Sequence, residues 1–219
     1  MSVLANQPAT CENECDCTID RNTKTGLIVL TGGPGAGKTA VLEIIRKELC
    51  EHIVILPEAA SIVFGGGFWR LPSKSARLAS QHAILHVQQQ SENLVLNEKK
   101  WAIGLCDRGT LDGLAYWPDE ESAFWDAAQS DLKREYDRYQ AVIHLRTPTE
   151  DFGYNHHNPL RIETAVQAEE IDNKIAVVWS GHPHYHVVES TADFLVKAEL
   201  ALQHIKQYIP SCCRHSSLA

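Results

Sequence analysis

The segment from Gly32 to Thr39 combines glycines, one lysine and one threonine at a spacing that suits phosphate chemistry. It matches the phosphate-loop (P-loop) pattern of Gly, four residues and Gly-Lys-Ser/Thr. Glycines let successive backbone N–H groups curl around an anion, and a following helix adds the unpaired donors of its first turn. Lys38 can supply charge to the outer phosphates, and the Thr39 hydroxyl can ligate Mg²⁺. We therefore predict a nucleotide-binding loop formed by Gly32, Gly33, Pro34, Gly35, Ala36, Gly37, Lys38 and Thr39.

The segments on either side of this loop are those that a P-loop requires. An apolar run, 27–30, precedes it and an amphipathic stretch, 38–51, follows it, which speaks against an accidental glycine-rich turn. The same alternation continues and predicts an α/β fold with a parallel sheet and helical crossovers. The expected strands are 27–30, 53–56, 102–106, 141–145 and 184–188. The expected helical segments are 38–51, 59–64, 73–96, 119–139, 160–179 and 192–208.

Charged side chains follow the expected strands at the edge where a parallel sheet binds its ligands. Asp107 follows the third strand and can hold Mg²⁺, directly or through water, opposite Thr39. A capping role at the next turn is the alternative for Asp107. Arg108 can clamp a phosphate or carboxylate through two hydrogen bonds, or form a surface ion pair without a further role. The predicted metal ligands are Thr39 and Asp107.

Two further carboxylates follow the second and third strands. Glu58 is the candidate base, because a hydroxyl that attacks phosphorus must lose its proton. The alternative is a glutamate that is favoured by the dipole at a helix N-terminus. Asp112 can bind substrate or metal, or it can stabilise a turn or cap.

A polar, turn-rich segment, 150–159, is expected to form a mobile loop in front of Arg161. From there Arg161 can act as a lid arginine that neutralises the charge developing on the transferred phosphoryl group. Glu163 and Glu169 can instead pair with Arg161 on the surface of a helix. The predicted catalytic residues are Lys38, Glu58, Asp107, Arg108 and Arg161.

Three further clusters each allow two interpretations. Phe68-Trp69-Arg70 follows three glycines and can either stack on an acceptor or pack its loop onto the core. Histidines near the expected lid and fifth strand lack the helical spacing of a metal site, so we expect neutral side chains at His156, His157, His182, His184 and His186. The two tails carry thiols whose spacing is unusual for a metal site, so we expect flexible tails around Cys11, Cys15, Cys17, Cys212, Cys213 and His215.

Size and charge limit the function classes. The 219 residues suit one P-loop domain, 25–210, between a Cys-containing N-terminal tail, 1–24, and a C-terminal tail, 211–219. The formal net charge of −8 argues against nucleic acid or an anionic membrane as the main partner. Neither a membrane-spanning run nor a signal-peptide pattern is present, so we expect a cytoplasmic protein of unspecified oligomeric state.

These motifs resemble the kinase-like P-loop proteins of an AAA-labelled ATP-binding family, which includes the ribosylnicotinamide-kinase domain of NadR. The resemblance covers about residues 25 to 209, and Asp107-Arg108 is also similar to the pair found at this place in thymidylate kinases. It implies a three-layer α/β/α sandwich with a five-stranded parallel sheet in the order 2-3-1-4-5. It also implies ATP or GTP with Mg²⁺, Asp107 near the metal and Glu58 facing the acceptor. The segments that carry it are 31–39, 57–60, 107–117, 144–148 and the lid helix with Arg161 and Glu163.

Together these features predict Mg²⁺-dependent phosphoryl transfer from ATP to a small hydroxyl-bearing acceptor, such as a nucleoside, a nucleotide or a related metabolite. The alternative is a nucleotide-dependent regulatory switch or binding protein in which hydrolysis is slow. A guanine-selecting Asn-Lys-x-Asp motif does not occur, which favours ATP and leaves GTP possible.

Overall fold

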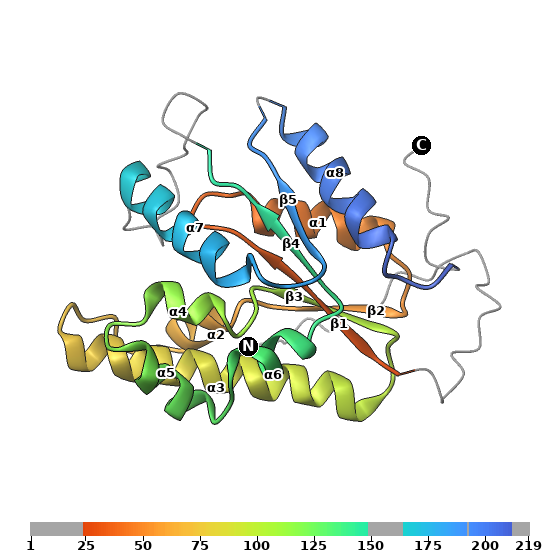
Figure 1. Cartoon of the computed structure of the whole chain (residues 1–219). Coiled ribbons are helices and arrows are strands. Elements are labelled where there is room, and N and C mark those ends of the chain that lie inside the picture. Colours follow the sequence, from red (N-terminus) through yellow and green to blue (C-terminus); the bar gives the residue numbers. More distant parts are fainter. Residues whose placement is uncertain (1–23, 149–163, 192, 212–219) are drawn as a thin grey trace, which may run out of the picture.

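Five parallel strands form the central sheet of the computed structural model, which describes residues 24–148, 164–191 and 193–211 (Figure 1). The sheet order is β2-β3-β1-β4-β5, and every strand pair is parallel. The predicted fold class and strand order are therefore confirmed. The strands are β1 (Gly26–Thr31), β2 (Ile53–Leu56), β3 (Ile103–Asp107), β4 (Ala141–Leu145) and β5 (Tyr185–Val188).

The register of the three central strands brings their carboxyl ends together. β1, β3 and β4 are buried along their whole length, as expected for strands that are covered on both faces. Leu30 of β1 lies opposite Asp107 of β3, and Thr31 lies opposite His144 of β4. The loops that follow these strands therefore begin side by side.

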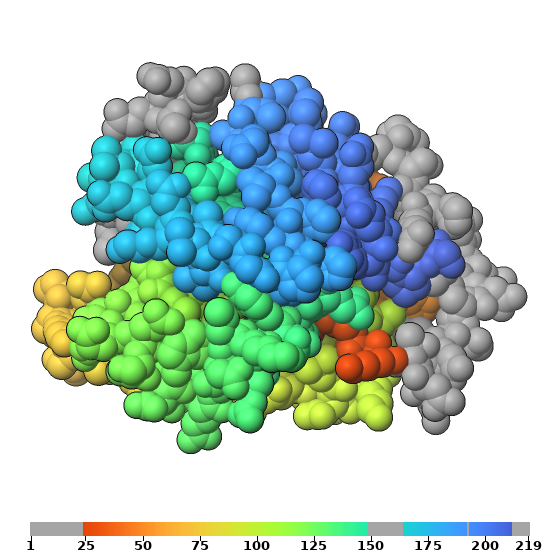
Figure 2. Space-filling model, viewed as in Figure 1, coloured from red at the N-terminus to blue at the C-terminus, as the bar shows by residue number. Residues whose placement is uncertain are grey.

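Helices cover both faces of the sheet and complete a three-layer sandwich (Figure 1). On one face lie α1 (Lys38–Glu48) and α8 (Phe194–Lys206). The other face carries α3 (Lys74–Glu98), α4 (Asp112–Tyr116), α5 (Glu121–Ala128), α6 (Leu132–Asp137) and α7 (Ala165–Trp179), and the short α2 (Ala59–Gly65) follows β2. In the space-filling view, the chain from α7 onward covers the upper half of this side of the molecule (Figure 2). Within the described ranges, every helix is too short or too polar to cross a membrane.

Two apolar clusters hold the layers together because successive side chains of a strand point to opposite faces. Ile28 and Leu30 of β1 pack against α1 and α8, where Ile45 and Ile205 are fully buried. Leu27 and Val29 belong to the second cluster, with Phe124 of α5 and Trp179 of α7 at its centre. β1 therefore anchors both layers directly before the P-loop begins.

The helical segment expected at 119–139 is two helices. Gln129 has a φ of 50° in the left-handed region and ends α5, and the side chain of Asp131 then caps α6 by accepting from Arg134 N. A further short helix, α4, follows Gly109-Thr110 and was not expected from the sequence. α7 begins at Ala165 behind a capping box formed by Thr164 and Gln167, whereas the predicted residues 160–163 lie outside the described ranges.

Substitution of two glycines by alanine tests this packing. A Cβ on Gly104 in β3 would lie 2.8 Å from Leu27 Cδ2 and 3.0 Å from Leu56 Cδ1. We therefore expect Gly104→Ala to lower the free energy of unfolding by about 1–3 kcal/mol through overpacking. The matched control is Gly65→Ala at the end of α2, where a Cβ has nothing within 4 Å. Denaturant unfolding should show the control unchanged or more stable by up to about 1 kcal/mol, and equal losses would contradict the packing described.

Candidate functional site

The P-loop connects the end of β1 to the start of α1 along a path that glycine permits. Gly32 has a φ of +141°, and a Cβ at this position would lie 2.2 Å from the backbone oxygen of Leu145. Gly37 has a φ of +91° and is the N-cap of α1. Because Gly37 has no side chain to cap the first turn, the N–H groups of that turn remain for an anion. The loop is therefore built like an anion-binding turn.

Lys38 lies over the loop rather than in solvent. Its side chain is 7% exposed, and Nζ donates to the backbone oxygens of Gly32 at 2.8 Å and Gly33 at 3.2 Å. Burial and the neighbouring Arg108 lower the pKa of Lys38 to about 8, against the opposing effect of nearby carboxylates. Thr39, the next residue of α1, is exposed. Lys38 thus provides a positive charge at neutral pH beside the open donors of α1.

Asp107 ends β3 next to this loop and has an unsatisfied buried atom. Its Oδ1 is buried and makes no hydrogen bond within the described part of the chain. Burial and the charges of Glu58 and Asp112 raise the pKa of Asp107, while Lys38 and Arg108 oppose this effect. A buried carboxylate oxygen without a partner requires a cation or a donor.

Asp107 Oδ1, which has no partner, and the hydroxyl of the exposed Thr39 have the donor chemistry that a Mg²⁺ ion requires. Mg²⁺ prefers oxygen ligands, and its sites usually combine one or two protein oxygens with phosphate oxygens and water. In the described residues, no group of three or more His, Cys, Asp or Glu side chains forms a complete metal site. The phosphates and water would therefore have to supply the remaining ligands.

Arg108 joins the P-loop to the carboxylates that follow β2 and β3. Its Nε donates to Glu58 Oε1 at 2.8 Å, and Nη1 donates to Gly32 O at 3.1 Å and Asp112 Oδ2 at 3.2 Å. Its Cζ lies 5.4 Å from the centre of the Tyr116 ring. With a side chain only 14% exposed, Arg108 is not the surface ion pair that its sequence position also allowed.

Glu58 is held in its charged form. Ser61 Oγ donates to Glu58 Oε2 at 2.6 Å, on the opposite side from Arg108. Burial by itself would raise the pKa of Glu58, but Arg108, Ser61 and Lys38 together lower it to about 2. At neutral pH Glu58 is therefore a carboxylate that can accept hydrogen bonds but is only weakly basic.

Asp112 is fully engaged by side chains of the protein. Oδ2 accepts from Thr31 Oγ1 at 2.6 Å as well as from Arg108, and Oδ1 accepts from Trp179 Nε1 at 2.7 Å. The residue is 2% exposed. Asp112 therefore connects β1, α4 and α7 rather than offering a free carboxylate to a ligand.

The structure adds three residues that the sequence did not single out, namely Asp172, His144 and Lys197. Asp172 of α7 accepts from Gly33 N at 2.7 Å and is also bonded to His144 at the end of β4. Lys197 of α8 donates to Ala36 O at 2.9 Å. Asp172 and Lys197 are 1% and 4% exposed, on helix faces that are otherwise apolar. In the sequence, Asp172 and Lys197 are charged residues at positions that the helical spacing assigns to an apolar stripe, and this pattern could have identified them.

The remaining predicted residues either lie outside the described residues or have other surroundings. Arg161, Glu163, His156, His157 and the tail cysteines lie outside the described residues. Phe68 and Trp69 are 42% and 76% exposed, so they do not anchor their loop to the core. His186 bonds to Tyr208 and stacks on His204, and burial lowers its pKa, which fits a neutral side chain.

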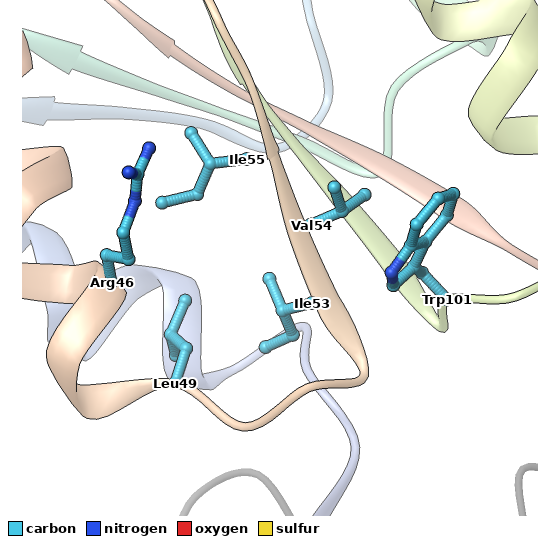
Figure 3. Close-up of a pocket in the computed structure, with 6 residues that line it drawn as sticks. All are labelled: Arg46, Leu49, Ile53, Val54, Ile55 and Trp101. Atoms are coloured by element: carbon cyan, nitrogen blue, oxygen red, sulfur yellow. The ribbon is translucent and has the colours of Figure 1, made fainter. Parts of the chain in front are cut away.

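Two hollows lie at the edges of the sheet rather than over the P-loop. One, of about 280 Å³, is bordered by side chains on both sides of β2, including Trp101 and Arg46 (Figure 3). The other, of about 470 Å³, lies between α7 and β5 and includes Arg146 and Glu189. Neither of these two hollows is lined by a P-loop residue or by Glu58, Asp107 or Arg108.

Comparison with known proteins identifies the family and the fold. The model of a family described as AAA domain matches residues 27–194. None of the curated proteins matches the sequence. The solved structures that share the fold include the following three, all at low sequence identity.

The first is thymidylate kinase from Ehrlichia chaffeensis, with a TM-score of 0.56, 14% identity and coverage of 84% of this chain and 99% of that one. Deoxyadenosine kinase from M. mycoides with bound dATP has a TM-score of 0.58 and 16% identity, and 82% and 98% of the two chains are covered. NadR protein in complex with NR has a TM-score of 0.63 and 12% identity, and 86% of this chain covers 52% of that one. At these identities the likeness establishes the kinase-like P-loop fold.

The lowered pKa of Lys38 predicts how nucleotide binding depends on pH. The cationic form is present below about pH 8 and is lost as the pH rises further. We expect the affinity for MgATP to fall above that pH, by up to about tenfold per unit, because one proton must then be taken up on binding. Calorimetry in buffers of different ionisation enthalpy measures this uptake.

Lys38→Ala should bind MgATP far more weakly and without the proton uptake. Tight, Mg²⁺-dependent binding by this variant would contradict the P-loop interpretation.

Proposed function

This chain belongs to the AAA domain family, and we propose that it is an ATP-binding phosphotransferase. With Mg²⁺, it transfers the terminal phosphoryl group of ATP to a small hydroxyl-bearing acceptor of the nucleoside or nucleotide type. GTP is a possible donor in place of ATP. The observation that carries this proposal is the bridge of Arg108 between Glu58 and Gly32, which joins a charged carboxylate to the start of the P-loop. The kinase-like neighbours support it at the level of the fold.

The donor half of the proposed site consists of the P-loop, Lys38, Thr39 and Asp107. The N–H groups of the loop and of α1 bind the phosphates, and Lys38 turns from the loop carbonyls to the outer phosphate oxygens. Thr39 and Asp107 would hold Mg²⁺, which would neutralise the charge that develops on the phosphates. The unpartnered Oδ1 of Asp107 supports this assignment.

The acceptor half consists of Glu58 and the groups that fix it. Glu58 accepts a hydrogen bond from the hydroxyl group of the acceptor substrate. This bond directs the hydroxyl oxygen toward the terminal phosphorus of ATP. A pKa of about 2 makes Glu58 a weak base. Phosphoryl transfer has a loose transition state in most analyses, so the proton can move to the carboxylate late, as the new bond forms. The base predicted from the sequence is therefore proposed mainly as an orienting group.

The partners of Arg108 bear on the kind of acceptor. Arg108 already bonds to Glu58, Asp112 and Gly32 O, so its charge is compensated within the protein. This favours recognition of the acceptor through its hydroxyl and its ring system, for which the exposed rings of Phe68 and Trp69 are available. Arg161 remains a proposed lid arginine, and the net charge of −8 supports a small acceptor over nucleic acid.

Substitution of Glu58 separates the two halves. In Glu58→Gln we expect MgATP affinity to stay within about twofold, because the donor half is intact, while transfer falls by about 10²-fold or more. The control is Ser61→Ala, which removes the 2.6 Å hydrogen bond to Glu58 but keeps the carboxylate. It should lose much less activity. Unchanged transfer by Glu58→Gln would remove Glu58 from the acceptor half.

A panel of nucleosides, nucleotides and nicotinamide riboside identifies the acceptor. Release of ADP from MgATP is measured with and without each compound. Stimulation by one compound, which is itself recovered as a phosphate ester, supports the phosphotransferase. Slow turnover that no compound stimulates would favour the regulatory switch instead.

A further inference from the structure

We propose that Asp172 is a positioning residue, which holds the P-loop in its phosphate-binding shape from helix α7. Its contact with the loop is the hydrogen bond from the backbone N–H of Gly33 to Oδ1, at 2.7 Å. Gly33 is the second residue of the P-loop pattern and is separated from Asp172 by 139 residues in the sequence. This inference rests on the proposed function, because the shape of the loop matters only if the loop binds phosphate.

Three groups converge on this carboxylate and fix its orientation. In addition to the bond from Gly33, Oδ1 accepts from His144 Nε2 at 2.8 Å, and Oδ2 forms an ion pair with Arg146 Nη1 at 2.9 Å. His144 is itself fixed by a hydrogen bond to the hydroxyl of Tyr185 on β5. A carboxylate with two hydrogen bonds and an ion pair of this kind has little freedom to turn away from Gly33.

The charge of Asp172 is maintained although the side chain is almost completely buried. Burial by itself would raise the pKa of Asp172, but the hydrogen bond and charge of His144, the N–H of Gly33 and the charge of Arg146 lower it overall. A charged acceptor makes the bond from Gly33 stronger than a bond between neutral groups. Because it is only 1% exposed, Asp172 does not contact a nucleotide and acts through the loop.

The packing of the P-loop on α7 is independent evidence that α7 positions the loop, and it does not depend on charge. A Cβ on Gly33 would lie 2.7 Å from Asp172 Cβ, 2.8 Å from Ala168 O and 2.6 Å from Thr147 Oγ1. The backbone of the loop is thus seated directly on the buried face of α7. On the other side, Lys197 of α8 donates to Ala36 O at 2.9 Å. The loop is held at Gly33 and at Ala36, which leaves the residues from Gly37 onward to face the phosphates.

The contacts at Gly33 and Ala36 lower the entropic cost of binding phosphate to the P-loop. A loop whose backbone is already fixed loses less conformational freedom when phosphate binds, so the binding energy is retained as affinity. Loss of the Asp172 contact should therefore weaken nucleotide binding more than it weakens the fold. Loss of a residue with only a structural role would instead weaken the fold more than it weakens nucleotide binding.

The test uses the full chain, MgATP as the ligand and three variants. We expect Asp172→Ala to raise the Kd for MgATP by about tenfold or more, the effect of losing a hydrogen bond to a charged group. Asp172→Asn keeps one oxygen that can accept from Gly33, so its Kd should lie between those of Asp172→Ala and the parent chain. The comparison variant, Tyr185→Phe, removes the hydrogen bond at the far end of the same chain of contacts and keeps the Asp172 carboxylate, so it should raise Kd much less than Asp172→Ala does.

A second measurement reads the contact itself. In a protein with ¹⁵N-labelled glycine, the amide proton of Gly33 should resonate downfield because it donates to a carboxylate, and Asp172→Ala should remove this shift. Parent-like Kd in Asp172→Ala, or equal weakening by Tyr185→Phe, would overturn the proposal. If Asp172→Ala does not fold, an unchanged Kd and Gly33 shift in Asp172→Asn would overturn it. Failure of the parent chain to bind MgATP would contradict the proposed function itself, and the Gly33 shift would still report on the contact.

Discussion

The buried guanidinium of Arg108 is the group on which the arrangement of this site depends. A buried cation is costly unless charges and hydrogen bonds compensate it, and Glu58, Asp112 and Gly32 O provide this compensation. Each of the three belongs to a different segment: the end of β2, the start of α4 and the start of the P-loop. Compensation of one charge therefore requires that all three segments meet at one point.

The backbone of Arg108 is also constrained, with a φ of 76° in a region that non-glycine residues rarely adopt. Its N–H donates to Leu30 O, and its carbonyl accepts from Gln88 Nε2 of α3 at 3.0 Å. Gln88 is in turn bonded to Glu92, a buried carboxylate that Arg138 and Tyr139 also contact. α3 thus fixes the backbone of Arg108, and contacts outside the site maintain its strained conformation.

α7 connects the two halves of the site. Near its middle, Asp172 accepts from Gly33 in the donor half, and at its end Trp179 Nε1 donates to Asp112, which holds Arg108. Both residues belong to the buried stripe of one rigid helix. A displacement of α7 would therefore change the P-loop and the Arg108 cluster together. The helix follows directly on the segment 149–163, in which the proposed lid arginine, Arg161, lies.

The sequence by itself determined the features that depend on local chemistry. The glycine spacing from Gly32 to Gly37 identified the P-loop, and the residues that follow apolar runs placed Glu58, Asp107 and Arg108 at one edge of a parallel sheet. These inferences succeed because the carboxyl ends of parallel strands must meet at the same edge. The alternation of strands and helices gave the fold class for the same reason, since each element carries its own periodicity.

Only the tertiary structure decided which of these side chains interact and which remain available. The sequence left Asp112 open between a ligand carboxylate and a turn or cap residue, but contacts with Thr31 and Trp179, at sequence separations of 81 and 67 residues, occupy it. Asp172 and Lys197 lie on apolar stripes, and their roles depend on backbone atoms of the P-loop that come close only after folding. Local patterns place a residue on an element and at its end, but a hydrogen bond between distant elements depends on their packing angle and register. The physical reason for the limit is that these quantities are set by the whole core rather than by any one segment.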